Sequence, residues 1–136
     1  MDVISASNIT ASALNAEKLR LDIVAENIAN ANTTKGADGL AYQRKTVSFE
    51  SVADQVFGGA GGVRVGATSK DATPGNTVYN PSHPHADKNG MVTMPNVNLA
   101  FEMVDLMSAS HSYEANLAVI RNARQMASQA LSIGRF

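Results

Sequence analysis

The sequence AENIANANTTKG, Ala25–Gly36, is the point at which a long helical pattern gives way to a polar turn. It contains three asparagines, Asn27, Asn30 and Asn32. Asparagine is a mediocre residue for a helix interior, because its amide competes for nearby backbone groups. Two explanations are open. Either the asparagines cap the helix and form the following turn, or Asn27 and Asn30, one turn apart on one face, bond to neighbouring molecules.

An apolar stripe at helical spacing precedes these asparagines. Leu14, Leu21 and Ile28 recur every seven residues, and Val24 lies on the same stripe. The first glycine or proline of the chain occurs at position 36. The sequence therefore predicts a helix from residue 3 to about residue 31.

A second apolar seam lies near the C-terminus, between residues 97 and 133. Ten positions at heptad spacing fall on it, and eight of them are apolar, which is typical of a coiled coil. We expect Asn96 or Asn98 to cap the start of this helix, and Gly134 to end it. The heptad positions are Leu99, Met103, Leu106, Ser110, Tyr113, Leu117, Ile120, Arg124, Ala127 and Leu131.

Between the two helices, nine of the ten glycines and all four prolines occur in 33–95. Strand-like runs at 41–52 and 62–67 have short apolar and β-branched character. The stretch from residue 79 to 95 predicts a chain of turns with one short strand at 91–94. This segment is expected to be small, irregular and rich in β-structure.

The predicted fold is mainly α with a β-rich insert. We expect an N-terminal core helix in 1–32, a loop-rich β insert in 33–95 and a C-terminal core helix in 96–136. The two long helices are expected to form an antiparallel coiled-coil-like hairpin. Each helix would be about 40 to 55 Å long at 1.5 Å per residue. Helices of that length exceed a domain of this size, so much of their surface is expected to contact other chains.

Composition excludes several classes of protein. Lys and Arg number 11 against 12 Asp and Glu, so no basic excess points to nucleic acid. The chain has no cysteine, which excludes disulfides and thiolate sites. It has no apolar run of 18 residues, so we expect no insertion in a membrane. The N-terminus lacks the pattern of a cleaved secretory signal, and on this ground alone the chain would be cytoplasmic.

Catalytic and metal-binding patterns are weak. His83, His85 and Asp87 lie close together in the chain, but no second cluster supplies the four converging ligands that a metal site usually needs. The sequence DKNG at 87–90 lacks the alternating acids of a calcium loop and predicts a β-turn. No phosphate loop, nucleophile elbow or HExxH motif occurs. We expect no enzyme activity, no cofactor and no metal.

Both ends of the chain resemble a known family. LDIVAENIANANTTKG, at 21–36, is similar to the N-terminal signature of the rod and hook proteins, the axial proteins of the bacterial flagellum. The stretch from MPNVNLAFEMVDL to MASQALSIGR, at 94–135, is similar to their C-terminal helix. With GLAYQRKTVSFE at 39–50 and YNPSHPHADKNGMVTMPNV at 79–97, the resemblance is strongest to the proximal rod.

The resemblance implies a structural subunit of the basal-body rod, which polymerises through its terminal helices into the drive shaft. Implied partners are further copies, other rod proteins, the membrane-ring protein at the rod base and the flagellar type III export apparatus. The implied location is the periplasmic rod, reached without a cleaved signal peptide, with terminal segments that order on assembly. Alternatives are another rod or hook protein, or a cytoplasmic coiled-coil adaptor or export chaperone.

The residues expected to form the subunit interface lie on the two helical stripes. An apolar stripe alone permits sliding, whereas a polar group at a packed position fixes the register. The predicted interface residues are Leu14, Leu21, Val24, Asn27, Ile28, Asn30, Met103, Leu106, Tyr113, Asn116, Leu117 and Ile120.

Overall fold

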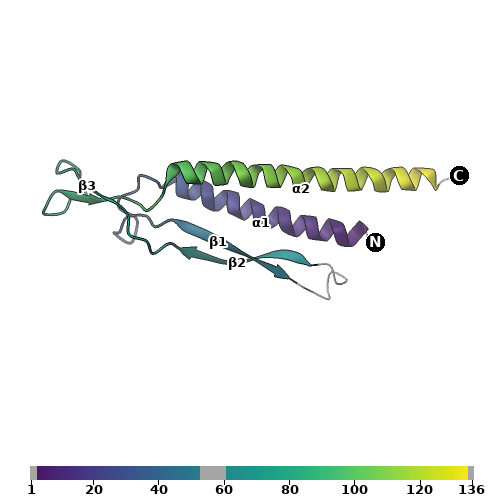
Figure 1. The fold of residues 1–136 in the computed structure, drawn as a ribbon, viewed down its shortest axis with the longest axis horizontal. Helices are drawn as coiled ribbons and strands as arrows, with labels where there is room; N and C mark the ends of the chain where they lie inside the picture. Colours follow the sequence, from purple (N-terminus) through teal and green to yellow (C-terminus); the bar gives the residue numbers. More distant parts are fainter. Residues whose placement is uncertain (1–2, 53–60, 135–136) are drawn as a thin grey trace. The chain divides into compact units, whose positions relative to one another are not determined.

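The computed structural model describes residues 3–52 and 61–134, which contain two long helices and four strands (Figure 1). This confirms the predicted long terminal helices with a small β region between them. The elements in chain order are α1 (Val3–Ala29), β1 (Lys45–Val52), β2 (Gly62–Lys70), β3 (Thr77–Tyr79), β4 (Met91–Thr93) and α2 (Leu99–Ile133).

The chain forms two compact units, each assembled from segments that are distant in the sequence. Unit 1 comprises Met1–Leu21, Ser48–Ala67 and Met107–Phe136. Unit 2 comprises Asp22–Val47 and Thr68–Leu106. Both helices, and the ribbon of β1 and β2, therefore contribute residues to both units.

Helix α1 ends close to the predicted position, but of the predicted stripe only Val24 is buried, whereas Leu14, Leu21 and Ile28 are half-buried. Its buried residues Ala16, Ile23, Val24 and Asn27 are spaced seven, one and three apart, which places them on one helix face. Just beyond Ala29 the backbone closes the helix with hydrogen bonds such as that from the Asn30 amide to the Glu26 carbonyl at 3.0 Å.

Helix α2 begins with a side-chain cap. The Oδ1 atom of Asn98 accepts hydrogen bonds from the amides of Ala100 at 3.1 Å and Phe101 at 3.4 Å. Asn98, and not Asn96, is therefore the N-cap of α2. At the other end, the amide of Gly134 bonds to the Ala130 carbonyl at 3.2 Å, and the helix stops as predicted.

In unit 2, β3 and β4 form an antiparallel hairpin in which Val78 pairs with Val92. Val92 is 2% exposed and belongs to the small apolar core. The predicted strand at 91–94 is confirmed. Strand β3 was missed, and only its last residue, Tyr79, lies in the stretch predicted as turns. The predicted β-turn at 87–90 is also confirmed, with a hydrogen bond from the Gly90 amide to the Asp87 carbonyl at 3.0 Å.

Strands β1 and β2 form a separate two-stranded sheet. They occupy the two predicted runs, with β2 extending three residues beyond the expected 62–67. In unit 2, the hydroxyls of Thr46 and Ser69 lie 2.9 Å apart across the sheet. In unit 1, the hydroxyl of Ser48 accepts a hydrogen bond from the Ala67 amide at 3.0 Å.

Candidate functional site

The most unusual feature of unit 2 is a cluster of polar side chains, two of them buried and three half-buried, which we call the polar junction: Asn27, Tyr42, Arg44, Lys45 and Glu102. Asn27, only 1% exposed, is its centre. The side-chain nitrogen of Asn27 donates to the Lys45 carbonyl at 2.8 Å and to the Glu102 carboxylate at 3.0 Å. Its oxygen accepts from the Tyr42 hydroxyl and from the Lys45 amide, both at 2.9 Å. One side chain thus joins three separate segments of the chain.

Glu102 is the other fully buried polar residue of the polar junction, with no exposed surface. The Nε atom of Arg44 donates to its second carboxylate oxygen at 2.5 Å. Each oxygen of Glu102 therefore has a partner, one charged and one neutral. A buried carboxylate without such partners would cost several kcal/mol, so Arg44 and Asn27 are required where Glu102 is buried.

The ionisable groups beside Tyr42 strengthen its role as a donor. Burial, together with the negative charges of Glu26 and Glu102, raises the pKa of Tyr42 to about 12. The hydroxyl therefore keeps its proton and its hydrogen bond to Asn27. Lys45 adds an ion pair to Glu26 at 2.5 Å on the more exposed side. Each side chain of the polar junction is thus held by at least one hydrogen bond to another part of the chain.

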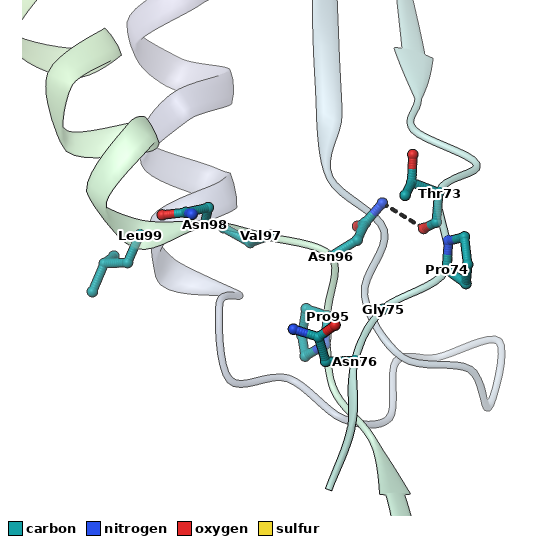
Figure 2. Close-up of a pocket in the computed structure, with 9 residues that line it drawn as sticks. All are labelled: Thr73, Pro74, Gly75, Asn76, Pro95, Asn96, Val97, Asn98 and Leu99. Atoms are coloured by element: carbon teal, nitrogen blue, oxygen red, sulfur yellow. Dashed lines mark hydrogen bonds between the residues drawn. The ribbon is translucent and has the colours of Figure 1, made fainter.

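Asn96 extends these contacts to the strand connections. Its oxygen accepts from the Arg44 amide at 2.7 Å, and its nitrogen donates to the carbonyls of Asp71 at 3.1 Å and Thr73 at 2.9 Å. Figure 2 shows Asn96 reaching across to Thr73 at the edge of an open cleft of about 420 Å³. The cleft is lined by residues 73–76 and 95–99. Because the Asn96 side-chain amide forms hydrogen bonds within the chain, it connects separate segments and is not available to bind a ligand.

The start of α2 has the opposite burial pattern to an ordinary amphipathic helix, in which apolar side chains are buried and charged ones are exposed. Its carboxylate, Glu102, is buried, whereas four apolar residues are exposed. We call these the exposed apolar face: Leu99 (45% exposed), Phe101 (72%), Met103 (51%) and Val104 (64%). A soluble chain rarely exposes so many adjacent large apolar side chains unless they contact something.

In unit 1, the C-terminal part of α2 is also uncovered. Residues 124–134 are all exposed, including Met126, Leu131 and Ile133. The inner side of α2 in this unit is formed by Ala109, which is fully buried, and by half-buried residues such as Tyr113 and Leu117. Most of this segment therefore offers surface that nothing in the described chain covers.

The predicted interface residues separate into three groups. Val24 and Asn27 are buried within the chain, and Met103 is exposed. The others are half-buried: Leu14, Leu21, Ile28, Asn30, Leu106, Tyr113, Asn116, Leu117 and Ile120. Sequence reasoning missed Glu102, Arg44 and Tyr42, because their partners lie far away in the chain.

The three asparagines of the opening stretch have different fates. Asn27 bonds within the polar junction. Asn30 acts at the helix end, where its nitrogen donates to the Glu26 carbonyl at 2.9 Å and its oxygen accepts from the Thr33 hydroxyl at 3.1 Å. Asn32 is exposed in the turn. The capping explanation therefore holds for Asn30, and Asn27 has a role that neither explanation foresaw.

The histidine pair of the insert makes one contact within the pair and one to the turn that follows α1. The rings of His83 and His85 meet edge to face with centroids 5.3 Å apart, and Nδ1 of His85 lies 2.8 Å from the Thr34 hydroxyl. Within residues 3–52 and 61–134, no group of three His, Asp or Glu side chains is placed to hold a metal ion. Nor does either described helix have the length and apolarity to cross a membrane.

Two family models match the chain at its ends. The model for the flagella basal body rod protein matches residues 8–37. The model for the C-terminal region of the flagellar basal body rod FlgEFG proteins matches residues 88–133. The first match contains Asn27 and the second contains Glu102, so the polar junction connects the two matched regions.

Curated relatives match nearly the whole chain. The flagellar basal-body rod protein FlgC of Salmonella typhimurium is 41% identical over 136 residues, covering 99% of this chain and all of the relative. FlgC of Agrobacterium fabrum is 44% identical, covering 98% of this chain and 96% of the relative. FlgC of Borreliella burgdorferi is 39% identical, with 98% of each chain covered.

Proposed function

Because the chain belongs to the flagellar basal-body rod protein family, where FlgC proteins match it end to end, we propose that it forms the proximal rod and polymerises through its terminal helices. It is a structural rod subunit and not an enzyme. The observation that carries the mode of assembly is the exposed apolar face of α2, formed by Leu99, Phe101, Met103 and Val104. Apolar side chains on a rigid helix are suited to packing against helices of other subunits.

The predicted antiparallel coiled-coil-like hairpin belongs to this proposal. In it, the half-buried residues of α1 and α2 pack partly within the subunit and partly against neighbouring subunits, and the exposed apolar residues pack between subunits. Asn27 is removed from the proposed interface, because all of its hydrogen-bonding groups are used within the chain. Phe101 and Val104 take its place.

The proposed partners are further copies of the chain, other rod proteins, the membrane-ring protein at the base of the rod and the flagellar type III export apparatus. The proposed location is the periplasmic section of the basal body, reached without a cleaved signal peptide. Family membership supports these assignments. Export as an extended chain followed by folding at the growing tip would let contacts with neighbours offset the cost of ordering.

A charge on the exposed apolar face provides the direct test. Val104→Asp and Phe101→Asp are expected to abolish rod assembly and motility, because each would bury an unpaired carboxylate at a subunit contact. Both side chains are exposed in the single chain, so the purified variants should keep the circular dichroism of the parent. Val104→Ile is the matched control and should assemble. Normal rods in both Asp variants would contradict the proposed interface.

Cross-linking distinguishes contacts between subunits from contacts within one. The chain has no cysteine, so two cysteines introduced together in place of Leu21 and Leu117 are its only thiols. We expect oxidation of intact cells to give cross-linked species with other rod proteins in the envelope fraction. A product confined to the cytoplasm, or partners from the hook alone, would contradict the proximal-rod assignment. Leu21→Asp and Leu117→Asp should likewise block assembly while leaving expression unchanged.

A further inference from the structure

In unit 2, the hairpin of β3 and β4 leaves one edge of β3 open. The pairing of the two strands continues beyond them, with a hydrogen bond from the Asn80 amide to the Gly90 carbonyl at 2.8 Å. In an antiparallel pair only alternate residues bond to the partner strand, so the even-numbered residues of β3 bond to β4. The amides and carbonyls of Thr77 and Tyr79 therefore point away from β4. Within residues 3–52 and 61–134, no third strand pairs with that edge.

The outer edge of β4, in contrast, is closed in two ways. The Asp87 amide donates to the Met91 carbonyl at 2.9 Å, and the Asp87 carboxylate accepts from the Met91 amide at 2.8 Å. Two residues after the strand, Pro95 has no amide to donate. Edge strands pair with other chains unless charges, prolines or covering segments block them. Strand β3 contains neither a charge nor a proline, and its nearest Lys, Arg, Asp or Glu is seven residues before Val78 in the chain, at Asp71.

The side chains of β3 are also exposed. Val78 is 50% exposed and Tyr79 is 68% exposed. Val78 lies opposite Val92, which is 2% exposed, so the apolar face of the hairpin is covered on the β4 side and half open on the β3 side. An isolated two-stranded sheet is marginal in water, and additional strands stabilise it. The open edge and the exposed side chains of β3 are therefore both suited to an added strand.

We propose that β3 pairs antiparallel with β3 of a second copy of the chain, with Val78 opposite Val78. In this register the outward groups of Thr77 meet those of Tyr79 in the other copy, and the two strands exchange about four hydrogen bonds. The two hairpins merge into one four-stranded sheet. A second copy fits this edge because the strand is complementary to itself and carries no charge that would repel its equivalent.

Both faces of the merged sheet support this register. On one face, Val92 and Val78 of each copy form a row of four valines, in which each Val78 covers the exposed half of the other. On the opposite face, Tyr79 of one copy lies beside Thr77 of the other, a pairing of an aromatic with a β-branched side chain that stabilises sheets. Moving the register by two residues would place Val78 opposite Asn76 or Asn80 and interrupt the row of valines.

This pairing is distinct from the contacts of a rod. A contact in which the same strand meets itself has two-fold symmetry and closes after two subunits, whereas a growing rod needs head-to-tail contacts that do not close. The pairing therefore belongs to the subunit before assembly. It goes beyond the rod function proposed above and does not rest on it.

Single-cysteine variants of the purified full-length chain test the register. The chain has no cysteine, so each variant has one thiol. Val78→Cys places two thiols directly opposite each other, at a separation that a disulfide can span. Thr77→Cys is the matched control, because the residue opposite it is Tyr79. We expect Val78→Cys to form disulfide-linked dimers at least about 10-fold faster than Thr77→Cys under the same mild oxidation. Equal rates would overturn the proposal.

Sedimentation of the parent chain tests the pairing without a thiol. So short an edge buries little surface, and we expect a weak dimer that is populated at about 1 mM chain. Thr77→Pro removes an outward amide and leaves the hydrogen bonds between β3 and β4 in place. It should raise the dissociation constant at least about 10-fold, the effect of one or two lost hydrogen bonds.

Thr93→Pro makes the same change on the outer edge of β4 and should leave the dissociation constant unchanged, because Thr93 lies opposite Thr77 on the other strand of the hairpin. Circular dichroism of both proline variants checks that they fold, and the cysteine comparison stands if one does not. A parent chain that is monomeric at about 1 mM, or a dimer that both prolines weaken equally, would overturn the proposal. Each measurement uses the purified chain and is separate from the assembly assay.

Discussion

Replacing Asn27 with alanine removes the centre of the polar junction. The Asn27 amide makes four hydrogen bonds, and the truncated side chain would leave the amide and carbonyl of Lys45, the hydroxyl of Tyr42 and one oxygen of Glu102 without this partner. Three of these bonds join neutral groups, and the fourth is to a carboxylate.

The expected loss of stability follows from those four bonds. A neutral hydrogen bond contributes about 1 kcal/mol and one to a charged group about 2 kcal/mol, so the sum is about 5 kcal/mol. Tyr42 and Lys45 are half-buried, and water can replace part of what they lose. The expected decrease in the free energy of unfolding is therefore about 3 kcal/mol.

Urea unfolding followed by circular dichroism measures this decrease, and the neighbouring asparagines are internal controls. Asn30→Ala should cost about 1 kcal/mol, because it removes local bonds at a helix end. Asn32 is exposed, and Asn32→Ala should change stability by less than about 0.5 kcal/mol. The expected order of destabilisation is Asn27, then Asn30, then Asn32. If Asn27→Ala cost no more than Asn32→Ala, the polar junction would not be the element that holds unit 2 together.

Three further substitutions test individual contacts. The parent chain should lose stability as the pH rises from 10 to 12, because the Tyr42 pKa is about 12 in the folded chain and lower in the unfolded chain. Tyr42→Phe should remove this loss, and urea unfolding of both proteins across this pH range measures it. Hydrogen bonds from the side chain and backbone of Thr73 lower the pKa of Asp71, so its stabilising contribution is lost as the pH falls. Thr73→Val should raise that pKa toward its ordinary value in an NMR titration. Gly75→Ala should destabilise the chain by about 1–3 kcal/mol in urea, because the added methyl group would collide with the Met94 carbonyl oxygen.

The helices were predictable because their signals are local. Apolar spacing, the absence of glycine and proline before residue 36, and a choice of two asparagines for the N-cap of α2 are all read within a few residues. The three-residue strand β3 was not predictable in this way. It depends on pairing with β4, which lies more than ten residues further along the chain.

The polar junction could not be predicted from the sequence either, because it also depends on contacts between distant segments. Nothing near Asn27 in the sequence indicates that its partners are Lys45 and Glu102, because these residues lie far away in the chain and come close only in the fold. Asparagine near the end of a helix predicts a cap, and Asn30 fits that prediction. A buried amide with four long-range bonds has no local signature that separates it from such a cap.

The seam of α2 shows how the polar junction overrides the apolar pattern. Heptad spacing predicts that Leu99 and Met103 face inward, yet both are about half exposed and Glu102 is buried instead. At 100° per residue, the inner face at this end is turned by about 60° from the predicted seam. Apolar burial alone would favour the other rotation.

What selects the observed rotation is the requirement that a buried carboxylate keep its partners. A buried ion pair adds little net stability compared with apolar residues of the same size, but leaving it half-satisfied is expensive. Only one rotation of α2 brings Glu102 to both Arg44 and Asn27. That same rotation turns Phe101 and Val104 outward, since neighbouring positions on a helix face different directions. The residues that fix the inside of unit 2 therefore also determine which apolar side chains it offers to the rest of the rod.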